Sequence, residues 1–135
     1  MGTIKSRNIL NYAMENAGIL VHKKSSFPKD FPKTQGVYLI RDKSEKIIYV
    51  GKAKNLHRRI NSDHISGDLD MTTSIFRKKL SRKFPKIVPG KQMRKWVIEN
   101  CLFSFVEIEN PDLCHLVEAL TIIIARDSNL GLMNA

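Results

Sequence analysis

Two short runs of strand-forming residues joined by a polar turn constrain the fold of this chain more than any other feature. Residues 36–41 (GVYLIR) and 46–51 (KIIYVG) are rich in Val, Ile, Leu and Tyr, and the intervening residues 42–45 (DKSE) are typical of a turn. The pattern predicts an antiparallel hairpin. A symmetric four-residue turn would bring Tyr38 directly opposite Tyr49, so that two phenol rings share one side of the sheet.

The rest of the chain predicts helices and one further strand. Alternating apolar residues at 102–108 (LFSFVEI) predict a third strand. Apolar residues at helical spacing predict a short helix after Gly90 and longer helices over residues 3–20, 55–63, 72–84 and 112–126. The expected fold is therefore α/β, with a small, mainly antiparallel three-stranded sheet flanked by helices. We divide the chain into a helical extension and connector at 1–35 and a domain at 36–135.

Local signals refine these helices. Gly18 is a plausible end for the first helix, which would leave residues 19–21 as a short strand or core plug. Residues suited to cap the later helices are Asn55, one of Thr72, Thr73 or Ser74, and Asp112. In the helix over 72–84 we expect Ile75, Phe76, Leu80 and Phe84 to face the core, and Arg77, Lys78, Lys79, Arg82 and Lys83 to face outward. The helix over 112–126 has apolar residues on all sides and should be buried on most of them. Trp96 is expected in the core rather than as a platform for stacking bases.

The distribution of charge is the unusual feature of the composition. The 135 residues carry 23 Lys and Arg against 13 Asp and Glu, a net charge of +10. The whole excess lies between Lys52 and Lys95, because the remaining residues carry equal numbers of each sign. A basic segment of this kind is either a solvated surface or the contact surface for a polyanion such as nucleic acid.

Other classes of protein are disfavoured. Cys101 and Cys114 are too few and too far apart for a disulfide framework, and no Cys/His array suggests zinc. The N-terminal residues do not resemble a signal sequence, and the longest apolar run, 119–125, is far shorter than the roughly 20 residues that span a bilayer. We expect a cytoplasmic protein, associated with the nucleoid if the source is bacterial.

Glu118 is the one acidic residue between Leu113 and Ala125, on a helix that is otherwise apolar. A buried carboxylate must pair with a cation, become protonated or bind a metal ion. The residues alone leave these alternatives open, with an ion pair as the simplest. For Tyr38 and Tyr49 the simplest interpretation is likewise cross-strand packing.

The tripeptides Gly36-Val37-Tyr38 and Tyr49-Val50-Gly51, with Arg59 ten residues after the second tyrosine and a glutamate on a later helix, resemble the GIY-YIG nuclease family. Residues 51–56 (GKAKNL) and Arg59 are most similar to the N-terminal incision domain of the bacterial excision-repair nuclease. The resemblance extends from about Gly36 to the C-terminus and is least detailed between 67 and 90.

The resemblance implies a metal-dependent DNA endonuclease that hydrolyses phosphodiester bonds and leaves 5′-phosphate and 3′-hydroxyl ends. Glu118 would hold a single Mg²⁺ (or Mn²⁺) ion per active site, and Arg59 would stabilise charge on the phosphate. Tyr38 matches the proposed general base, which requires nearby cations to lower a phenol pKa of about 10. Tyr49 would position water or phosphate, and Lys52 would contact phosphate or help to shift the pKa of Tyr38.

Two auxiliary residues follow from the same resemblance. Asn134 matches a terminal asparagine of the family. Relatives place a tyrosine or histidine four residues after the arginine, but here that residue is Asp63 and His64 comes next. Either His64 substitutes through a distortion at the end of the helix, or the auxiliary role is absent. His57 is interpreted as a solvated surface group.

The expected DNA contacts are cations of the basic segment: Lys52, Lys54, Arg58, Arg77, Lys78, Arg82, Lys91 and Arg94. Specificity would come from residues 1–35, from residues 64–100, from a homodimer or from a targeting partner protein. Cutting of the restriction, homing or repair type is consistent with the resemblance. The alternative function is a basic nucleic-acid-binding module that does not cleave.

Overall fold

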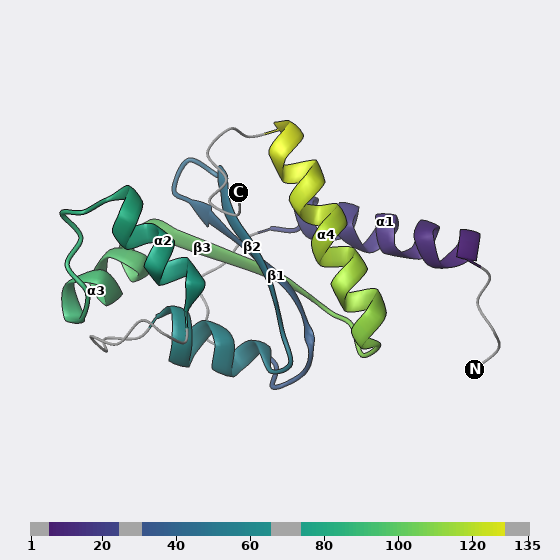
Figure 1. The fold of residues 1–135 in the computed structure, drawn as a ribbon, viewed down its shortest axis with the longest axis horizontal. Helices are drawn as coiled ribbons and strands as arrows, with labels where there is room; N and C mark the ends of the chain where they lie inside the picture. The colour runs from purple at the N-terminus through teal and green to yellow at the C-terminus, as the bar shows by residue number, and fades with distance from the viewer. Residues whose placement is uncertain (1–5, 25–30, 66–73, 129–135) are drawn as a thin grey trace.

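The computed structural model describes residues 6–24, 31–65 and 74–128, which form a three-stranded antiparallel sheet with helices on both faces (Figure 1). The strand order is β2-β1-β3, so the first strand is central. This confirms the predicted α/β fold. The elements in chain order are α1 (Ser6–His22), β1 (Gly36–Asp42), β2 (Ile47–Ala53), the π-helix η1 (Arg58–His64), α2 (Ile75–Lys83), α3 (Lys91–Asn100), β3 (Cys101–Glu107) and α4 (Pro111–Ser128).

The sheet separates two hydrophobic cores. Helices α1 and α4 cover one face, while η1, α2 and α3 lie on the other side (Figure 1). Because successive side chains of a strand point to opposite faces, Val37 and Leu39 pack with α1 and α4, and Tyr38 and Ile40 pack with the other helices. The central strand is therefore buried on both faces, and only one of them receives the phenol of Tyr38.

The turn of the hairpin is not the symmetric turn that we predicted, because Asp42 rather than Arg41 pairs with Lys46. Asp42 N–H donates to the carbonyl oxygen of Lys46 (2.9 Å), and Glu45 has a positive φ of 67°. The Asp42 carboxylate holds this turn by accepting from the N–H and hydroxyl groups of Ser44 and from Lys46 N–H.

The hairpin register also differs from the prediction. Tyr38 pairs with Gly51 and Tyr49 pairs with Ile40, whereas Arg41 pairs with Ile47. The extra residue, Ile48, forms a β-bulge and packs on the same side of the sheet as Tyr49. The predicted direct pairing of the two tyrosines is therefore wrong, although both still lie on one face.

Helix α1 continues through Gly18 to His22, so the predicted stop and the strand or plug after it are wrong. Gly18 needs no special backbone angle, and a Cβ atom added to it would meet no other atom within 4 Å. Leu20 is fully buried in the core shared with α4. The helix thus covers one side of the sheet.

Helix caps follow the expected chemistry with one exception. The Asn55 side chain accepts from Arg58 N–H (3.0 Å), and Ser74 Oγ accepts from Arg77 N–H (3.1 Å). The cap of α4 is Asn110 rather than Asp112, because Asn110 Oδ1 accepts from the N–H groups of Asp112 and Leu113.

The predicted faces of α2 and α4 need correction. Arg77 is fully buried, whereas Ile75 and Phe84 are 57% and 42% exposed. Phe84 lies beyond the last residue of α2 and has non-helical backbone angles, so the helical stripe does not extend to it. Ile123 is 52% exposed, so α4 is less enclosed than predicted. Among the described residues, no helix combines the length and the apolar character needed to cross a membrane.

Candidate active site

Two phenols meet on the face of the sheet that packs against η1 and α2. Their ring centroids are 6.4 Å apart, and Tyr38 and Tyr49 are 2% and 7% exposed. Tyr38 lies opposite Gly51 in the ladder, where a Cβ atom would overlap the phenol hydroxyl. The glycine of the second tripeptide is therefore required for close approach of the Tyr38 ring to the neighbouring strand.

The helix after the hairpin is a π-helix, whose hydrogen bonds span five residues instead of four. Ile65 N–H donates to the carbonyl oxygen of Ile60 (3.0 Å). In this wider turn His64, five residues after Arg59, points into the core and is 2% exposed. His64 Nε2 lies 2.5 Å from Tyr38 Oη. The π-helix is thus a distortion of the kind that His64 needs in order to substitute for the auxiliary residue.

The other imidazole nitrogen of His64 is also engaged. Nδ1 lies 2.6 Å from Ser74 Oγ, the same hydroxyl oxygen that accepts from Arg77 N–H at the start of α2. A continuous chain of hydrogen bonds thus runs from the Tyr38 phenol through the imidazole to the Ser74 hydroxyl. Because Ser74 is fixed by its role as a helix cap, the orientation of the imidazole ring is fixed as well.

Burial keeps the groups of this chain neutral. It raises the pKa of Tyr38 well above the ordinary value of a phenol, and the charges of Tyr49, Glu118 and Asp63 act in the same direction, whereas Arg59 lowers it. The expectation that nearby cations lower this pKa is therefore not met. Burial and the charges of Arg59 and Arg77 lower the pKa of His64 to about 3, so its imidazole is neutral at pH 7.

Arg59 is oriented by the residue that stands in the position of the missing auxiliary group. Arg59 Nη1 lies 3.5 Å from the Asp63 carboxylate, one turn along the helix. The Arg59 side chain remains 40% exposed, while that of Asp63 is 16% exposed. Arg59 also lowers the pKa of Tyr49, against burial and the Glu118 charge, which raise it. Its guanidinium thus lies within electrostatic range of both phenols.

Glu118 approaches the same region from α4, at the edge strand β2. A backbone hydrogen bond from Lys52 reaches its carboxylate. Burial raises the pKa of Glu118, while the charges of Lys52 and His115 and this hydrogen bond act against the rise. Lys52 Nζ lies 2.8 Å from His115 Nδ1.

Lys52 pairs with Val37, whose side chain lies on the α1–α4 side of the sheet, and Tyr38 lies on the opposite side. A direct role for Lys52 in shifting the pKa of Tyr38 is therefore not supported. The Glu118 charge nevertheless raises the pKa of Tyr38 and of Tyr49, so Glu118 lies within electrostatic range of both phenols.

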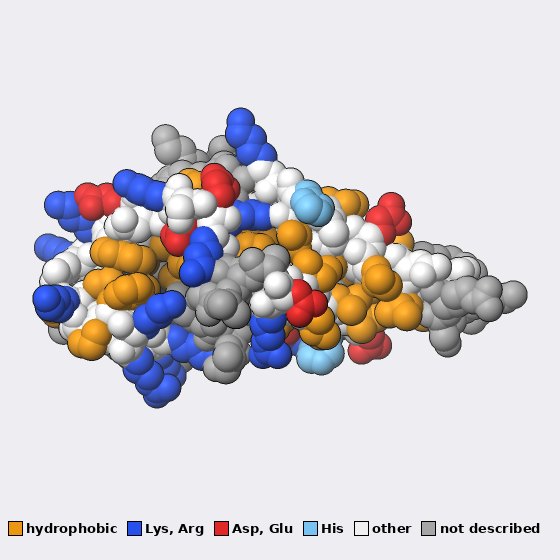
Figure 2. All heavy atoms as spheres, turned by 90° about the horizontal axis from the view of Figure 1, so that it is seen from above, with side chains coloured by type: hydrophobic (Ala, Val, Ile, Leu, Met, Phe, Trp, Pro, Cys, Tyr) orange, Lys and Arg blue, Asp and Glu red, His pale blue; other side chains and the backbone are white. Residues whose placement is uncertain are grey.

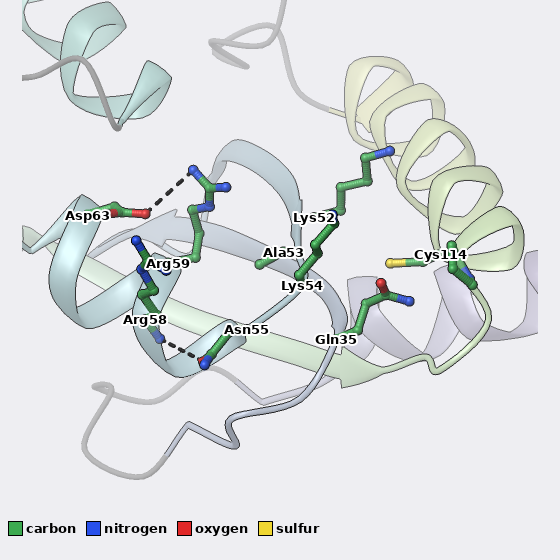
Figure 3. Close-up of a pocket in the computed structure, with 10 residues that line it drawn as sticks. Gln35, Lys52, Ala53, Lys54, Asn55, Arg58, Arg59, Asp63 and Cys114 are labelled. Carbon is green, nitrogen blue, oxygen red and sulfur yellow. Dashed lines mark hydrogen bonds and ion pairs between the residues drawn. The ribbon is translucent and has the colours of Figure 1, made fainter.

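An open pocket of about 620 Å³ lies beside these groups, between η1 and the start of α4 (Figure 3). Neither phenol is among its lining residues. Four cations line it against one carboxylate, that of Asp63. The side chains that line the pocket are Gln35, Lys52, Ala53, Lys54, Asn55, Arg58, Arg59, Asp63, Pro111 and Cys114. Its positive charge suits a segment of sugar-phosphate backbone.

The donor set near this pocket fits a hard divalent cation that keeps most of its water. The described residues contain no cluster of three or more His, Cys, Asp or Glu side chains able to hold a metal ion. Glu118 instead offers one half-buried carboxylate beside a pocket suited to phosphate. Mg²⁺ commonly binds one or two carboxylates together with waters and substrate phosphates, so these residues are compatible with such an ion.

The other predicted site residues differ in their exposure. Lys78 is half-exposed and Arg77 is buried, so the prediction that Arg77 is a surface contact is wrong. Asn134 lies outside the described residues. The remaining predicted DNA contacts have exposed side chains: Lys52, Lys54, Arg58, Arg82, Lys91 and Arg94.

Sequence reasoning missed one member of the hydrogen-bonded chain. Ser74 was recognised as one of three candidate caps, but not as a partner of His64. The position of Ser74 as a helix cap indicates that it could have a second partner, because a hydroxyl oxygen that accepts from a helix N–H can also accept from a second donor. What the residues could not indicate is that the π-helix directs His64 toward Ser74.

Comparison with known proteins identifies the same region. The family model of the UvrC-like GIY-YIG domain matches residues 34–101. This span includes Tyr38, Tyr49 and Arg59 but ends before α4. The candidate role of Glu118 therefore depends on its proximity to these groups.

Individual relatives share the match. The UvrABC system protein C of Caldicellulosiruptor saccharolyticus is 34% identical over 70 residues, which are 52% of this chain and 12% of that protein. The protein of the same name from Chlamydia abortus is 37% identical over 78 residues (57% and 13%), and that from Francisella tularensis subsp. holarctica is 39% identical over 79 residues (58% and 13%). The chain thus matches only 12% to 13% of the length of these relatives.

Proposed function

Because the chain belongs to the family of UvrC-like GIY-YIG domains, which are nuclease domains, we propose that it is an endonuclease that hydrolyses DNA phosphodiester bonds with one divalent metal ion. The products would carry 5′-phosphate and 3′-hydroxyl ends. The relatives are named as components of the UvrABC system, and incision of DNA in repair is one setting for this activity. Restriction and homing are alternative settings for the same chemistry.

The observation that carries the proposal is the hydrogen-bonded chain from Tyr38 to His64 and Ser74, next to Arg59. A phenol held at 2.5 Å from a neutral imidazole has a proton acceptor already in position. Plain packing of two tyrosines would not require a buried histidine with both nitrogens engaged. The arrangement supports a role in proton transfer.

The raised pKa of Tyr38 bears on how the proton moves. A free phenolate is costly in this buried environment, so deprotonation of Tyr38 before attack is unfavourable. In the proposed step, a water oxygen bonds to phosphorus while its proton passes to Tyr38 Oη and the phenol proton passes to His64 Nε2. The phosphorus–O3′ bond breaks, and the leaving oxygen takes a proton from solvent. The phenol stays neutral throughout. Burial and the charges of Arg59 and Arg77 disfavour the imidazolium at His64, so the proton reaches Nε2 only as negative charge develops on the phosphate.

This direction of transfer requires one tautomer of His64. Nε2 must be free of hydrogen to accept, so Nδ1 must carry the hydrogen and donate it to Ser74 Oγ at 2.6 Å. The hydroxyl oxygen of Ser74 can accept from His64 and from Arg77 N–H at the same time. Ser74 is then a positioning residue for the proton acceptor.

Arg59 and the cations of the pocket would bind the phosphate. A guanidinium is permanently charged and can donate two parallel hydrogen bonds to phosphate oxygens. The Asp63 carboxylate orients the Arg59 side chain, while its 40% exposure leaves it accessible to DNA. Lys52, Lys54 and Arg58, which line the same pocket, would hold the adjacent phosphates without reading the sequence.

Glu118 is the residue that would hold the metal ion. When bound, Mg²⁺ or Mn²⁺ supplies positive charge that stabilises the leaving oxygen. Burial raises the pKa of Glu118, so the carboxylate gains by having a cation beside it. Lys52 provides part of that compensation in the structure.

A nicking assay on supercoiled plasmid tests the proposal. Wild-type protein with Mg²⁺ should convert the plasmid to nicked or linear form, and EDTA should prevent this. Glu118→Gln and Arg59→Ala should each lower the rate by on the order of 10²-fold or more. Glu15→Gln on α1 and Arg126→Ala on α4 are matched controls with exposed side chains and should cut like wild type.

Two results would count against a nuclease. Equal cleavage by wild type, Glu118→Gln and Arg59→Ala would indicate a contaminating enzyme. Failure of every protein to cut, with DNA binding that weakens as salt rises, would instead favour a basic nucleic-acid-binding module.

A further inference from the structure

The end of the molecule formed by α2, α3 and the residues between them combines positive charge with exposed apolar groups. Residues 74–100 contain nine Lys and Arg and a single acidic residue, Glu99, whose carboxylate lies 3.9 Å from Lys95 Nζ. Apart from the buried Arg77, the side chains of these cations are exposed or half-exposed. In Figure 2, hydrophobic side chains gather at this end, on the left, with Lys and Arg side chains beside them. Such a surface attracts a polyanion.

Phe84 gives this surface an exposed aromatic ring. Its side chain is 42% exposed, although the sequence pattern predicted it in the core. Its backbone is fixed on both sides, because Phe84 N–H donates to Leu80 O and its carbonyl oxygen accepts from Ile87 N–H, both at 2.9 Å. Lys83 Nζ lies 5.9 Å from the centre of the ring. The ring is therefore held in place next to a cation.

Trp96 on α3 provides a second ring. The centroids of Phe84 and Trp96 are 5.9 Å apart, and their planes are inclined by 36°. Trp96 is half-buried and packs in part against the core. The two rings are tilted rather than stacked in parallel, so a planar group can lie on Phe84 and contact the indole.

We propose that this region, called here the Phe84 surface and made of Phe84, Trp96, Lys83, Lys86, Lys91 and Lys95, binds unpaired nucleotides. Base faces are hidden inside a duplex and become available only when bases are unpaired. Aromatic rings surrounded by cations bind such strands by stacking with the bases while the cations hold the phosphates. The inference rests on the proposed function in one respect, since it takes the bound strand to be part of the DNA that the nuclease cuts.

The exposed apolar side chains of α1 provide a comparison. Tyr12 is 51% exposed, more than Phe84. Residues 6–22, however, include a single Arg and no Lys, so positive charge is not concentrated around Tyr12. The same physical argument therefore predicts no base stacking at Tyr12, which makes this residue a matched control.

Binding can be measured without cleavage. The full chain is titrated into a fluorescein-labelled twelve-residue thymidine oligonucleotide in EDTA, and anisotropy gives the affinity. Phe84→Ala should weaken binding roughly 5- to 100-fold. Phe84→Trp should retain it, and Tyr12→Ala should match wild type. Trp96 is the sole tryptophan of the chain, so the oligonucleotide should quench the intrinsic fluorescence of the protein.

The inference is overturned if Phe84→Ala binds the oligonucleotide as well as Tyr12→Ala does, or if saturating oligonucleotide leaves Trp96 fluorescence unchanged. If the Phe84 surface binds an acidic protein instead of unpaired nucleotides, saturating oligonucleotide should leave Trp96 fluorescence unchanged. Circular dichroism establishes that each variant is folded. Because the assay contains no metal and needs no cutting, its failure leaves the nicking assay unaffected, and loss of nicking in Glu118→Gln leaves the oligonucleotide titration interpretable.

Discussion

Gly51 lies directly opposite Tyr38 in the β1–β2 ladder, and the ring of Tyr38 occupies the space that a side chain at position 51 would need. The phenol hydroxyl points past Gly51 to His64 Nε2. The missing side chain at Gly51 thus allows Tyr38 to contact its proton acceptor, His64. The glycine is not required to make the strand flexible. Tyr38 can reach His64 at 2.5 Å only while this position has no Cβ atom.

Replacing Gly51 by alanine should displace the Tyr38 ring. The overlap is with a buried aromatic side chain, and we expect a loss of about 1–3 kcal/mol in the free energy of unfolding. Gly18→Ala is the matched control: Gly18 lies in α1 with no atom close to the added methyl group, so this change should stabilise by about 0.5–1 kcal/mol. Urea unfolding of both variants measures the difference, and equal effects would contradict the steric argument.

Removing the imidazole of His64 should slow cleavage without preventing DNA binding. We expect His64→Ala to lower the single-turnover nicking rate by roughly 10²- to 10⁴-fold, the usual contribution of a positioned proton acceptor. His57→Ala removes a half-exposed imidazole from the same helical segment and should leave the rate unchanged. If His64→Ala cuts at the wild-type rate while Tyr38→Phe does not, Tyr38 acts without this histidine.

The role of Ser74 can be separated from its role as a helix cap. Ser74→Ala removes the cap of α2 and also the partner of His64 Nδ1, whereas Asn110→Ala removes only the cap of α4. Each should cost about 1 kcal/mol of stability. The nicking rate at saturating DNA should fall at least tenfold in Ser74→Ala and remain near wild type in Asn110→Ala. Equal rates would reduce Ser74 to a structural residue.

His64 should make the stability of the fold depend on acid. Its pKa is about 3 in the folded protein and about 6.5 when unfolded. The unfolded chain therefore binds a proton between these values that the folded chain does not, and stability falls as pH decreases, by roughly 1.4 kcal/mol per unit between about pH 6 and pH 4. Burial raises the pKa of Tyr38 and of Tyr49, so both phenols stay neutral in this range.

Urea unfolding at several pH values measures this slope, and His64→Gln is the comparison. Glutamine cannot titrate, so the variant should lose this part of the pH dependence. The raised pKa of Glu118 contributes in the opposite direction in both proteins and cancels in the difference. Parallel pH profiles for the two proteins would show that folding does not lower the pKa of His64.

The hairpin shows why sequence predicted the face of the two phenols but not their pairing. At the turn the pairing is shifted by one residue, because Asp42 rather than Arg41 pairs with Lys46 and Glu45 has positive φ, and Ile48 adds a bulge. A single one-residue slip would have moved Tyr49 to the opposite face. The two one-residue shifts, at the turn and at the bulge, together return Tyr49 to the predicted face, because successive side chains of a strand alternate between faces. The positive φ of Glu45 could not be predicted from its residue type, since positive φ is uncommon outside glycine and asparagine.

The side-chain partners on η1 and α2 were harder to predict. Helical periodicity assumes hydrogen bonds that span four residues, and on that assumption Asp63 rather than His64 follows Arg59 by one turn. In the π-helix both residues make a contact, because Asp63 pairs with Arg59 and His64 lies against Tyr38. Likewise a buried Arg77 contradicts simple patterning by polarity. Such features depend on tertiary contacts that no local propensity describes.

Arg41 attaches α1 to the sheet, and removing its guanidinium should loosen that helix first. The side chain is 6% exposed and donates to the carbonyl oxygens of Val21 and Lys23, at the end of α1, and to Ser104 Oγ at 3.1 Å. Hydrogen bonds from a charged donor are worth about 1.5–3 kcal/mol, and the part-buried carbonyl groups of Val21 and Lys23 would lose this partner. We expect Arg41→Met to lower the free energy of unfolding by about 2–4 kcal/mol.

Hydrogen exchange distinguishes this attachment from a general loss of packing. In Arg41→Met, amides of α1 should exchange faster than in wild type by a larger factor than amides of β1 and β3, because local opening of the helix no longer breaks the Arg41 contacts. Arg82→Met, which alters an exposed arginine on α2, should change stability by less than about 0.5 kcal/mol. Uniform acceleration across α1 and the sheet in Arg41→Met would mean that the helix and the sheet open as one unit, and that Arg41 contributes to the whole core rather than to the docking of α1.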